Sequence, residues 1–381
     1  MIISCNDPNY RQCSISVMDN IADPDIFFDE KGICNYYYEY KSAEKSLVKK
    51  GADAERELQS IIERIKQDGK GNKYDCVLGV SGGVDSTYLA YYASKVGLRV
   101  LCVHFDNGWN SELAVKNIEN IVNKFGFDLY TYVINWEEFR DIQLSYFKAN
   151  VVDIEAVSDI AILAALDKIC VEQRIKHILI GLNVATEITL PKSWICKNSS
   201  NLRDIHKTWG TKPIRSFPLM SPIRRRIVAR TKPFQNWLIL NYLPYIKKDI
   251  KEIIKNELGW RDYGGKHYES IFTRFYQGYI LPNKFHIDKR KAHLSNLIFS
   301  GQMTKEEALK ELERPIYPPE IFKSDYEFVL KKLGFTKEEF EHYIKSPSVP
   351  HSEYDLSLSI FDELEYLKPL RWLFGREKVP A

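Results

Sequence analysis

The sequence predicts an α/β fold with a doubly wound parallel sheet of the PP-loop, HUP-like kind, and three observations lead to that prediction. Short apolar runs, mostly rich in β-branched residues, recur at 76–80, 99–105, 129–133 and 177–181. A helical pattern separates each run from the next, as right-handed βαβ units require. The chain has 381 residues, of which 44% are hydrophobic and 13% aromatic, and this suffices for a substantial core.

The remaining elements are predicted in chain order from hydrophobic periodicity and capping signals. Residues 1–40 carry few periodic segments, and residues 186–222 are rich in proline, serine, lysine and tryptophan, which indicates loops around a site. Helices are expected at 52–68, 85–92, 111–125, 136–149, 159–173, 246–258, 303–312, 324–333, 336–345 and 356–374. We therefore expect an irregular N-terminal segment at 1–45, a main domain at 46–312 and a helical C-terminal tail at 313–381.

Charge, cysteine content and hydropathy give no indication of a nucleic-acid-binding, disulfide-bonded or membrane-spanning protein. The net charge is +3, from 54 basic and 51 acidic residues, so no nucleic-acid partner is required. Seven cysteines give an odd count, and Cys76 and Cys102 fall in predicted buried strands, where they are core residues rather than disulfide partners. The sequence shows no signal peptide and no apolar run of roughly 18 residues. We expect a soluble cytoplasmic protein.

The first predicted strand ends in a glycine-rich turn, Ser-Gly-Gly-Val-Asp-Ser at 81–86, from which a helix starts. Glycines allow close backbone approach, and the helix N-terminus attracts anions. No Walker lysine follows, and the charged side chain is that of Asp85, which indicates that a divalent cation bridges it to phosphates. The predicted nucleotide ligands of this turn are Ser81, Gly82, Gly83, Asp85, Ser86 and Thr87, with Mg²⁺ held through Asp85.

Three strand ends are expected to converge on one crevice, because ligands of such sheets bind beyond the carboxyl ends of the strands. Besides the glycine turn, they are 104–109 and 181–187. This places His104, Phe105, Asp106 and Gly181 among the predicted cofactor ligands. The alternative for His104 and Asp106 is a hydrogen-bonded core histidine and a helix-start aspartate.

A second unusual stretch, at 259–277, combines charges of both signs, aromatic residues and a Gly-Gly turn. Such a mixture favours a binding surface over a core, although an ion-pair network is the alternative. A further charged stretch follows at 288–293. The candidate catalytic residues are Asp85, Lys266, His267, Glu269, Arg274, Lys289 and Arg290. The basic run at 224–226 is either a solvated face or a clamp for an acidic substrate.

The turn at 81–86 resembles the PP-loop signature of ATP pyrophosphatases, which cleave ATP between the α and β phosphates. Longer motifs narrow the resemblance to the N-acetyl sugar amidotransferases of bacterial surface-polysaccharide and flagellin-glycan pathways. They lie at 103–112, 191–194, 259–270, 279–282 and 288–290. The similarity extends from about Cys13 to about Leu312.

This resemblance implies an ATP-dependent conversion of a sugar acetamido group, on a nucleotide- or lipid-linked sugar, into an acetamidino group, with release of AMP and pyrophosphate. The PP-loop holds the β and γ phosphates, while residues 104–106 and Gly181 border the adenosine. Lys266, Arg274, Lys289 and Arg290 neutralise developing charge. His267 or Glu269 accepts a proton from the attacking ammonia.

Two further expectations follow from the resemblance. The family's N-terminal zinc module carries two Cys-x-x-Cys pairs, of which only Cys13 and Cys34 remain here, with Ser16 and Tyr37 at the second positions. Two thiolates do not make a closed zinc site, and Cys5 is a candidate for a third ligand, but we expect a metal-free remnant held by hydrophobic packing. No glutaminase domain is recognisable, and a separate glutaminase, resembling the glutaminase and cyclase subunits of histidine biosynthesis, is expected to supply ammonia.

The residues leave two rivals open. One is a PP-loop enzyme that modifies tRNA, such as a thiolase or a lysidine-type ligase. It would need an RNA-binding surface, for which a net charge of +3 is thin support. The other is a nucleotide-binding scaffold without catalytic activity. The intact turn at 81–86 argues against the scaffold, because its acidic and hydroxyl members are all present.

Overall fold

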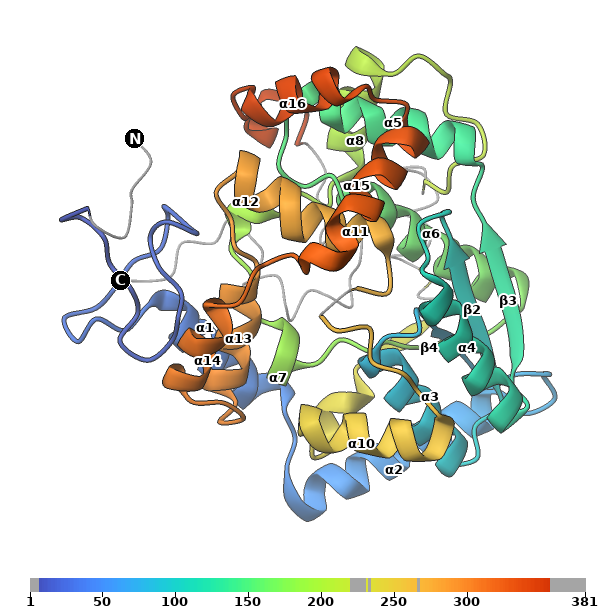
Figure 1. Ribbon diagram of the computed structural model, residues 1–381. Helices are drawn as coiled ribbons and strands as arrows, with labels where there is room; N and C mark the ends of the chain where they lie inside the picture. Colours follow the sequence, from blue (N-terminus) through green and yellow to red (C-terminus); the bar gives the residue numbers. More distant parts are fainter. Residues whose placement is uncertain (1–6, 220–230, 232–233, 266–267, 357–381) are drawn as a thin grey trace.

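Five parallel strands form one sheet, which lies toward one side of the molecule (on the right in Figure 1). The computed structural model describes residues 7–219, 231, 234–265 and 268–356. The strand order is β3-β2-β1-β4-β5, which is the order of a doubly wound sheet. The strands are β1 Cys76–Gly79, β2 Val100–Asp106, β3 Asp128–Val133, β4 His177–Leu179 and β5 Gln235–Trp237. The predicted fold class is confirmed.

Helices cover both faces of this sheet and extend beyond it. The α-helices are α1 Asn35–Leu47, α2 Gly51–Asp68, α3 Val84–Lys95, α4 Glu112–Phe125, α5 Trp136–Ala149, α6 Ala156–Glu172, α7 Val184–Glu187, α8 Ser199–Trp209, α10 Lys247–Leu258, α11 Ile271–Phe275, α12 Leu281–Lys284, α13 Arg290–Phe299, α14 Lys305–Leu312, α15 Pro319–Leu333 and α16 Lys337–Lys345. Short helical turns are η1 Lys192–Trp194, η2 Ile239–Tyr242, the π-helical η3 Tyr276–Ile280 and η4 His351–Glu353.

Side chains alternate between the two faces of the sheet, as the period of a strand demands. Leu78 and Val100 pack with α2, α3, α4 and α10 into one core. Val77, Leu101 and Val103 pack on the opposite face against α6. Because helices cover both faces of β1, β2 and β4, these strands are largely buried and the sequence shows them as apolar runs, whereas most residues of the edge strand β3 are exposed.

The structure corrects two predicted loop regions. Residues 186–222 contain α8, which begins where the side chain of Asn198 accepts hydrogen bonds from the backbone N–H groups of Ser200 and Asn201. Its apolar face is short and consists chiefly of Leu202 and Ile205, so the periodicity is weak in the sequence. In the predicted irregular segment, the described residues 7–34 contain no helix, and α1 begins at Asn35.

A single large core joins the N-terminal segment, the middle of the chain and the C-terminal helices. It contains Met18 and Tyr40 from the N-terminal part, Phe147 from α5 and Phe340 from α16. The predicted C-terminal tail is therefore helical as far as the structure describes it, and α15 packs against α11 in Figure 1. The tail shares its core with the rest of the protein.

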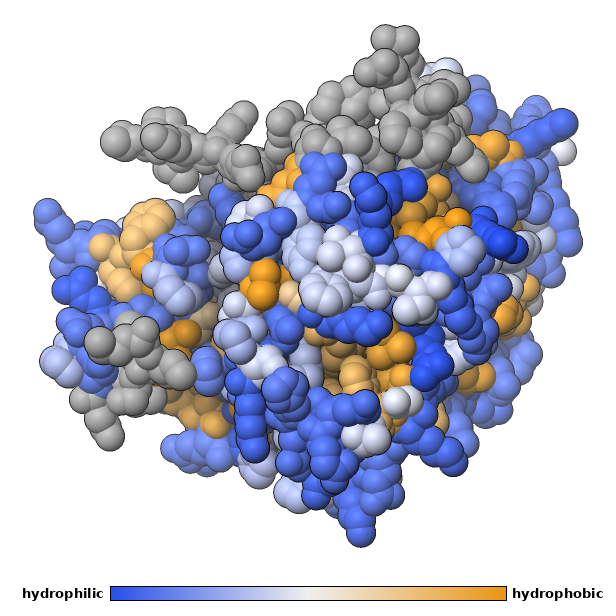
Figure 2. Space-filling view, turned by 90° about the horizontal axis from the view of Figure 1, so that it is seen from above, coloured by the Kyte–Doolittle hydropathy of each residue, from blue (hydrophilic) through white to orange (hydrophobic). Residues whose placement is uncertain are grey.

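The face of the molecule seen in Figure 2 is largely hydrophilic, and its apolar side chains lie in separate small groups. Exposed large apolar side chains of the described residues are spread over many elements and include Phe27, Val133, Trp209 and Phe328. Within the described part of the chain, no helix combines the length and the apolar character needed to cross a membrane.

Candidate functional site

The candidate site lies where the order of the strands reverses. β1 is flanked by β2 on one side and β4 on the other, so the connections leaving the sheet diverge at its carboxyl end. The turn at 81–83 follows β1 directly, and α3 starts at Val84. Open α/β sheets bind their ligands at such a point.

Gly82 forms the floor of the turn. Its φ angle of 78° lies in the left-handed region, and a Cβ atom at this position would stand 2.5 Å from the carbonyl oxygen of Ala114. Its own carbonyl oxygen accepts hydrogen bonds from Trp260 Nε1 at 2.9 Å and from Asn117 Nδ2 at 3.3 Å. The position therefore requires glycine for backbone conformation and for space.

The hydroxyl groups of Ser81 and Ser86 lie 3.4 Å apart across the turn. Ser81 Oγ accepts a hydrogen bond from the N–H of Gly83 at 3.2 Å, and Ser86 Oγ donates to the carbonyl oxygen of Gly83 at 3.3 Å. Both serines and Gly83 line a cavity of about 1080 Å³. The structure does not support Thr87 as a nucleotide ligand, because its side chain is fully buried on α3 and does not line the cavity.

Asp85, on the first turn of α3, also lines this cavity, and two side chains from outside the turn hold its carboxylate. Asn183 Nδ2 donates to Asp85 Oδ1 at 3.1 Å, and the hydroxyl of Tyr245 donates to the same oxygen. Burial and the charge of Asp85 raise the pKa of Tyr245 well above its usual value. Tyr245 thus stays protonated and remains a donor across the physiological range.

Gly181, after β4, approaches the same residue from the other side. A Cβ atom on Gly181 would lie 3.4 Å from Asp85 Cβ and 3.4 Å from the backbone nitrogen of Ser86. The end of β4 and the start of α3 are therefore in close contact, as the convergence of strand ends predicts. Gly181 lines the cavity.

The second unusual stretch folds over the turn at 81–86. Besides the Trp260 bond, Asn117 on α4 accepts from the N–H of Arg261 and donates to its carbonyl oxygen, both at 3.0 Å. The carbonyl oxygen of Glu269 accepts from the N–H of Ser111 at 2.9 Å, and the carbonyl oxygen of Trp109 accepts from the backbone N–H at 271 at 2.8 Å. Residues that follow β2 thereby join the turn to a stretch more than 140 positions later in the chain.

Acidic and basic side chains both line the cavity. Asp85, Glu187 and Glu269 line it, and the Glu269 carboxylate lies beside Gly83, where a Cβ atom would be 3.3 Å from its Oε1. Cations come from several elements and comprise Lys247, Lys248 and Lys251 on α10, Lys289 before α13, Arg290 on α13 and Arg314 after α14. This distribution suits a ligand with several anionic groups.

Three predicted cations differ in how their charge is used. Lys289 lines the cavity and forms an ion pair with Glu155 at 3.3 Å. Arg290 lines it too, and its guanidinium bonds Asp288 at 2.8 Å and three backbone carbonyls. Arg274 does not line the cavity, and two nitrogens of its guanidinium, Nε and Nη2, each donate to the buried Asp325 at 2.6 Å. Its predicted role in charge neutralisation stays a prediction.

The residues at the end of β2 lie beside the cavity without lining it. His104 is buried, with Nδ1 donating to the carbonyl oxygen of Val80 at 3.2 Å and Nε2 3.2 Å from Asn110 Nδ2. Asp106 Oδ1 accepts from the N–H of Gly108 at 2.9 Å, and Phe105 stacks on Tyr132. His104 is thus a hydrogen-bonded core histidine, whereas Asp106 ends β2 and does not start a helix, because Ser111 caps α4. Residues 104–106 do not line the cavity.

Two predicted residues, Lys266 and His267, lie outside the described residues. Their neighbours Gly264, Gly265, Tyr268 and Glu269 all line the cavity. Their proposed roles stay predictions.

The residues present fit a magnesium ion held mainly by phosphates. Mg²⁺ commonly takes one or two carboxylates from a protein and completes its shell with water and phosphate oxygens. Asp85 offers one oriented carboxylate at the mouth of the turn, and no group of three or more histidine, cysteine or acidic side chains within the described ranges forms a metal cage. Bound there, the ion would supply positive charge beside the β and γ phosphates.

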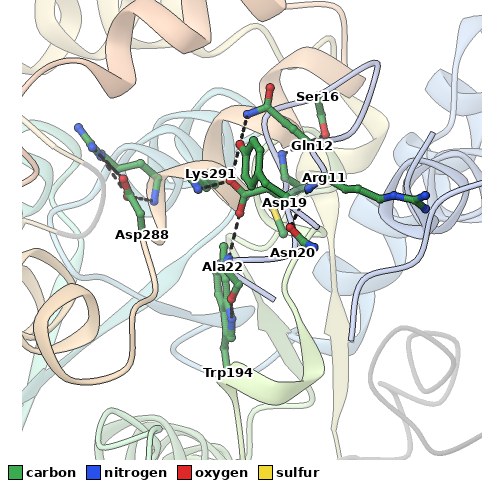
Figure 3. A network of polar contacts seen from close by, with 12 residues as sticks. Arg11, Gln12, Ser16, Asp19, Asn20, Ala22, Trp194, Asp288 and Lys291 are labelled. Atoms are coloured by element: carbon green, nitrogen blue, oxygen red, sulfur yellow. Dashed lines mark hydrogen bonds and ion pairs between the residues drawn. The ribbon is translucent and has the colours of Figure 1, made fainter. Parts of the chain in front are cut away.

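The N-terminal segment is held to the main domain by the polar network in Figure 3. Asp19, fully buried, pairs with Lys291 on α13 and accepts hydrogen bonds from Tyr10 at 3.1 Å and from the N–H of Ala22 at 2.9 Å. The carbonyl oxygen of Ala22 in turn accepts from Trp194 Nε1 at 2.8 Å. Lys291 directly follows Lys289 and Arg290, which line the cavity. The N-terminal segment therefore contacts the chain next to one wall of the cavity.

Cys13 and Cys34 come together within this segment, and both are buried. The N–H of Cys34 bonds Cys13 Sγ at 3.3 Å, and Ser16 Oγ lies 3.9 Å from Cys34 Sγ. The hydrogen bond from the Cys34 thiol, acting against burial, lowers the pKa of Cys13 to about 5. Among the described residues no third metal ligand joins them, so hydrogen bonds and apolar packing hold this part of the segment.

Sequence reasoning missed Asn117, Asn183 and Tyr245, which hold the turn and its aspartate. Asn183 lies two residues after the fourth apolar run, within the predicted strand end at 181–187, so its place was a usable signal. Asn117 sits inside a regular helix, and Tyr245 precedes one, and neither belongs to a motif. Lys247 and Lys248 are adjacent in the sequence near the start of the helix predicted at 246–258, but nothing in the sequence assigns them to the cavity.

Comparison with known proteins adds two family matches. Residues 75–208 match the family described as queuosine biosynthesis protein QueC. Residues 269–376 match the family described as LPS biosynthesis protein WbpG-like, C-terminal domain. A protein of Methanocaldococcus jannaschii, uncharacterized protein MJ1599, is 26% identical over 268 residues, which cover 70% of this chain and 82% of that protein.

Two solved structures overlap parts of the chain at low scores. An NMN synthetase from Francisella tularensis has a TM-score of 0.30 and 13% identity, covering 58% of this chain and 92% of its own. An NH₃-dependent NAD synthetase from Campylobacter jejuni has a TM-score of 0.29 and 12% identity, covering 54% and 93%. The turn at 81–86, its place at the switch point and the match at 75–208 make this part of the chain similar to PP-loop ATP pyrophosphatases, and residues 269–376 are similar to the C-terminal domain of WbpG-like LPS biosynthesis proteins.

Proposed function

We propose that this protein is an ATP-dependent amidotransferase that converts a sugar acetamido group into an acetamidino group for a surface polysaccharide. One observation carries the proposal: the two family matches meet in one cavity. The PP-loop wall lies within residues 75–208, and the opposite wall, with Gln277, Arg290, His293 and Arg314, lies within residues 269–376. One wall of the cavity thus comes from the region that is similar to a nucleotide-binding PP-loop family, and the opposite wall comes from the region that is similar to a polysaccharide-biosynthesis family.

The size and charge of the cavity support two substrates side by side. About 1080 Å³ exceeds the usual upper range of a site for one small ligand. ATP bound with its β and γ phosphates on the turn at 81–86 leaves the cations of the opposite wall for a second anionic molecule. A sugar joined to a nucleotide or lipid through a diphosphate has the matching charge.

The chemistry explains why an enzyme of this superfamily suits the reaction. An amide is a poor electrophile because its nitrogen donates electrons into the carbonyl group. Attack of the amide oxygen on the α phosphorus of ATP forms an O–P bond and releases pyrophosphate. Ammonia then adds to the activated carbon, the C–O bond breaks, and AMP leaves, so that NH replaces the oxygen.

Named residues have separate tasks in this scheme. The hydroxyls of Ser81 and Ser86 and the start of α3 bind the phosphates that leave as pyrophosphate. Lys289 and Arg290 stabilise the charge that develops on the activated oxygen. Glu269, whose carboxylate lies beside Gly83, is placed to accept a proton from the attacking ammonia.

The proposal is tested by mass spectrometry of the reaction products. The purified chain is incubated with ATP, Mg²⁺, ammonium and UDP-linked diacetamido sugars, with CMP-linked acetamido sugars in parallel. The expected result is AMP, pyrophosphate and a sugar in which NH replaces one oxygen. AMP formation with unmodified tRNA, and none with any acetamido sugar, would refute the proposed acceptor.

A second candidate is an enzyme that acts on a nucleoside precursor, and the match to QueC favours it. That match ends at residue 208 and includes none of the opposite wall, so it supports the nucleotide chemistry alone. A scaffold without activity is the third possibility, and it predicts ATP binding with no AMP formation under any of the conditions above.

The ammonia source is part of the same proposal. We propose a separate glutaminase partner, because no glutaminase motif is recognisable in these 381 residues. The purified chain should use ammonium and fail to use glutamine. Production of glutamate from glutamine by the chain alone would refute this part and leave the acceptor untouched.

A further inference from the structure

The carboxylate of Asp85 is held by side chains that belong to no nucleotide-binding motif. Its Oδ1 atom accepts from Asn183 Nδ2 at 3.1 Å and from the hydroxyl of Tyr245. Asn183 lies 98 positions after Asp85 and Tyr245 lies 160 positions after it. Both side chains are buried, with 1% and 8% of their surface exposed.

Asn183 is itself fixed in one orientation. Its Oδ1 atom accepts from the N–H of Thr186 at 3.0 Å and from the hydroxyl of Thr186 at 3.0 Å. These two donors identify that atom as the oxygen of the amide, so the NH₂ group faces Asp85. The residue therefore starts α7 with one end of its amide and holds Asp85 with the other.

Tyr245 is fixed by its surroundings as well. Its ring meets that of Tyr88 edge to face at 6.4 Å, and its carbonyl oxygen accepts from Gln302 Nε2 at 3.0 Å. Tyr245 and Asn183 also line a second cavity of about 770 Å³ on the side of α2. The two residues thus stand between the second cavity and Asp85, which lines the nucleotide cavity.

Two donors on one carboxylate oxygen prevent the carboxylate from rotating about its χ2 angle. A carboxylate that must meet a hard cation and triphosphate oxygens gains from such fixing, because no rotational freedom is lost on binding. Groups of this kind around metal ligands typically change metal affinity by about 10-fold to 100-fold when removed.

We propose that Tyr245 and Asn183 are positioning residues that aim the carboxylate of Asp85 at the Mg²⁺ that accompanies ATP. The proposal rests on the nucleotide site put forward above, and it assigns a function to two residues outside the PP-loop. Neither residue contacts the reacting atoms in this assignment.

The test measures ATP binding by isothermal titration calorimetry, on the full chain, over a series of Mg²⁺ concentrations. Tyr245→Phe removes the hydroxyl and keeps the ring that separates the two cavities. We expect the Mg²⁺ concentration for half-maximal ATP affinity to rise by about 10-fold. Saturating Mg²⁺ should restore the Kd for ATP to within about 2-fold of the unaltered protein, because positioning lowers metal affinity rather than removing the nucleotide surface.

Tyr242→Phe is the matched control. Tyr242 lies three residues earlier on η2, and its hydroxyl bonds Glu57 on the surface at 2.9 Å, away from Asp85. This variant should show the Mg²⁺ dependence of the unaltered protein. A second variant, Asn183→Ser, keeps a residue that can cap α7 and loses the amide that reaches Asp85, so it should reproduce the shift of Tyr245→Phe.

The outcomes separate this proposal from the one it rests on. If the unaltered protein does not bind ATP with Mg²⁺, the nucleotide site itself is refuted. If it binds and both Tyr245→Phe and Asn183→Ser keep its Mg²⁺ dependence, the positioning role is refuted. A loss of affinity that saturating Mg²⁺ does not restore would also refute it, since that is the result of a purely structural role.

Discussion

Replacing Asn117 by leucine is expected to weaken ATP binding while the chain stays folded. Asn117 is 1% exposed, and its side chain makes three hydrogen bonds, one to the carbonyl oxygen of Gly82 and two to the backbone of Arg261. Leucine has a similar size and makes none of them. At about 1 kcal/mol for each bond, the stretch at 259–265 loses about 2 kcal/mol of its attachment to α4, and α4 loses about 1 kcal/mol of its attachment to the turn at 81–86.

The expected change in affinity follows from this loss. If ATP binds only when the stretch is attached, the loss of about 2 kcal/mol sets an upper limit of about 30-fold on the rise in Kd. Calorimetry with ATP and Mg²⁺ measures the Kd, and hydrogen exchange of the amides at 259–265 should become faster in the variant. A control is Asn120→Leu, which removes one exposed bond of 3.2 Å to Gly259 and should change Kd little.

An unchanged Kd in Asn117→Leu, together with faster exchange at 259–265, would refute the reasoning, because it would show that ATP binds whether or not the stretch is attached. A thermal melt accompanies both variants. If Asn117→Leu melts below room temperature, the measurement is repeated with Asn117→Asp, which keeps the bond accepted from Arg261 and removes the two donated ones.

Three further substitutions have definite expected outcomes. Gly82→Ala should abolish ATP binding in calorimetry, because the new Cβ would lie 2.5 Å from the carbonyl oxygen of Ala114; retained binding would show that the turn can shift. Burial raises the pKa of Asp141, but hydrogen bonds from the chain at 206–212 prevail and lower it to about 2. The folded pKa is the lower one, so this stabilisation of about 2 kcal/mol is present at neutral pH and is lost as the pH falls from about 4 to 2. Asp141→Asn should lower the melting temperature at pH 7, and below pH 4 its melting temperature should decrease less with falling pH than that of the unaltered protein. Equal melting temperatures of the two proteins at pH 7 and below pH 4 would contradict this. Asp325→Asn leaves the half-buried Arg274 without its charge partner and should cost about 3 kcal/mol, and an equal urea midpoint would count against it.

The parts of the fold that sequence predicts are those whose signals are local. β1, β2 and β4 are short runs of largely buried, mostly apolar residues, and the exposed edge strand β3 is rich in tyrosine and β-branched residues, so these patterns do not depend on distant partners. The turn at 81–86 likewise carries its glycines, hydroxyls and carboxylate within six positions. β5 has three residues, all only half-buried, and its partner β4 lies 56 or more positions earlier, which leaves no local pattern to detect.

The contacts that complete the site are non-local, and this is why sequence alone does not reveal them. Asp85 and Tyr245 are 160 positions apart, and Asn117 and Arg261 are 144 apart. For Arg274, the non-local contact occupies a predicted cation of the site instead of adding a residue to it. A dense charged stretch indicates cations available to a substrate, but the partner of Arg274 is Asp325, 51 positions later, and their pairing is visible only in the folded chain.

The ion pair between Asp19 and Lys291 has a consequence for how the protein is made. The two residues are 272 positions apart, so during synthesis the N-terminal segment leaves the ribosome long before its partner helix exists. Asp19 is fully buried in the finished protein, and until α13 is translated its carboxylate must stay in water. Domains generally fold as units in the order of synthesis, but this one cannot close its first segment until most of the chain is present. We expect nascent chains that end before residue 291 to leave residues 7–34 open to proteases, and longer chains to protect them.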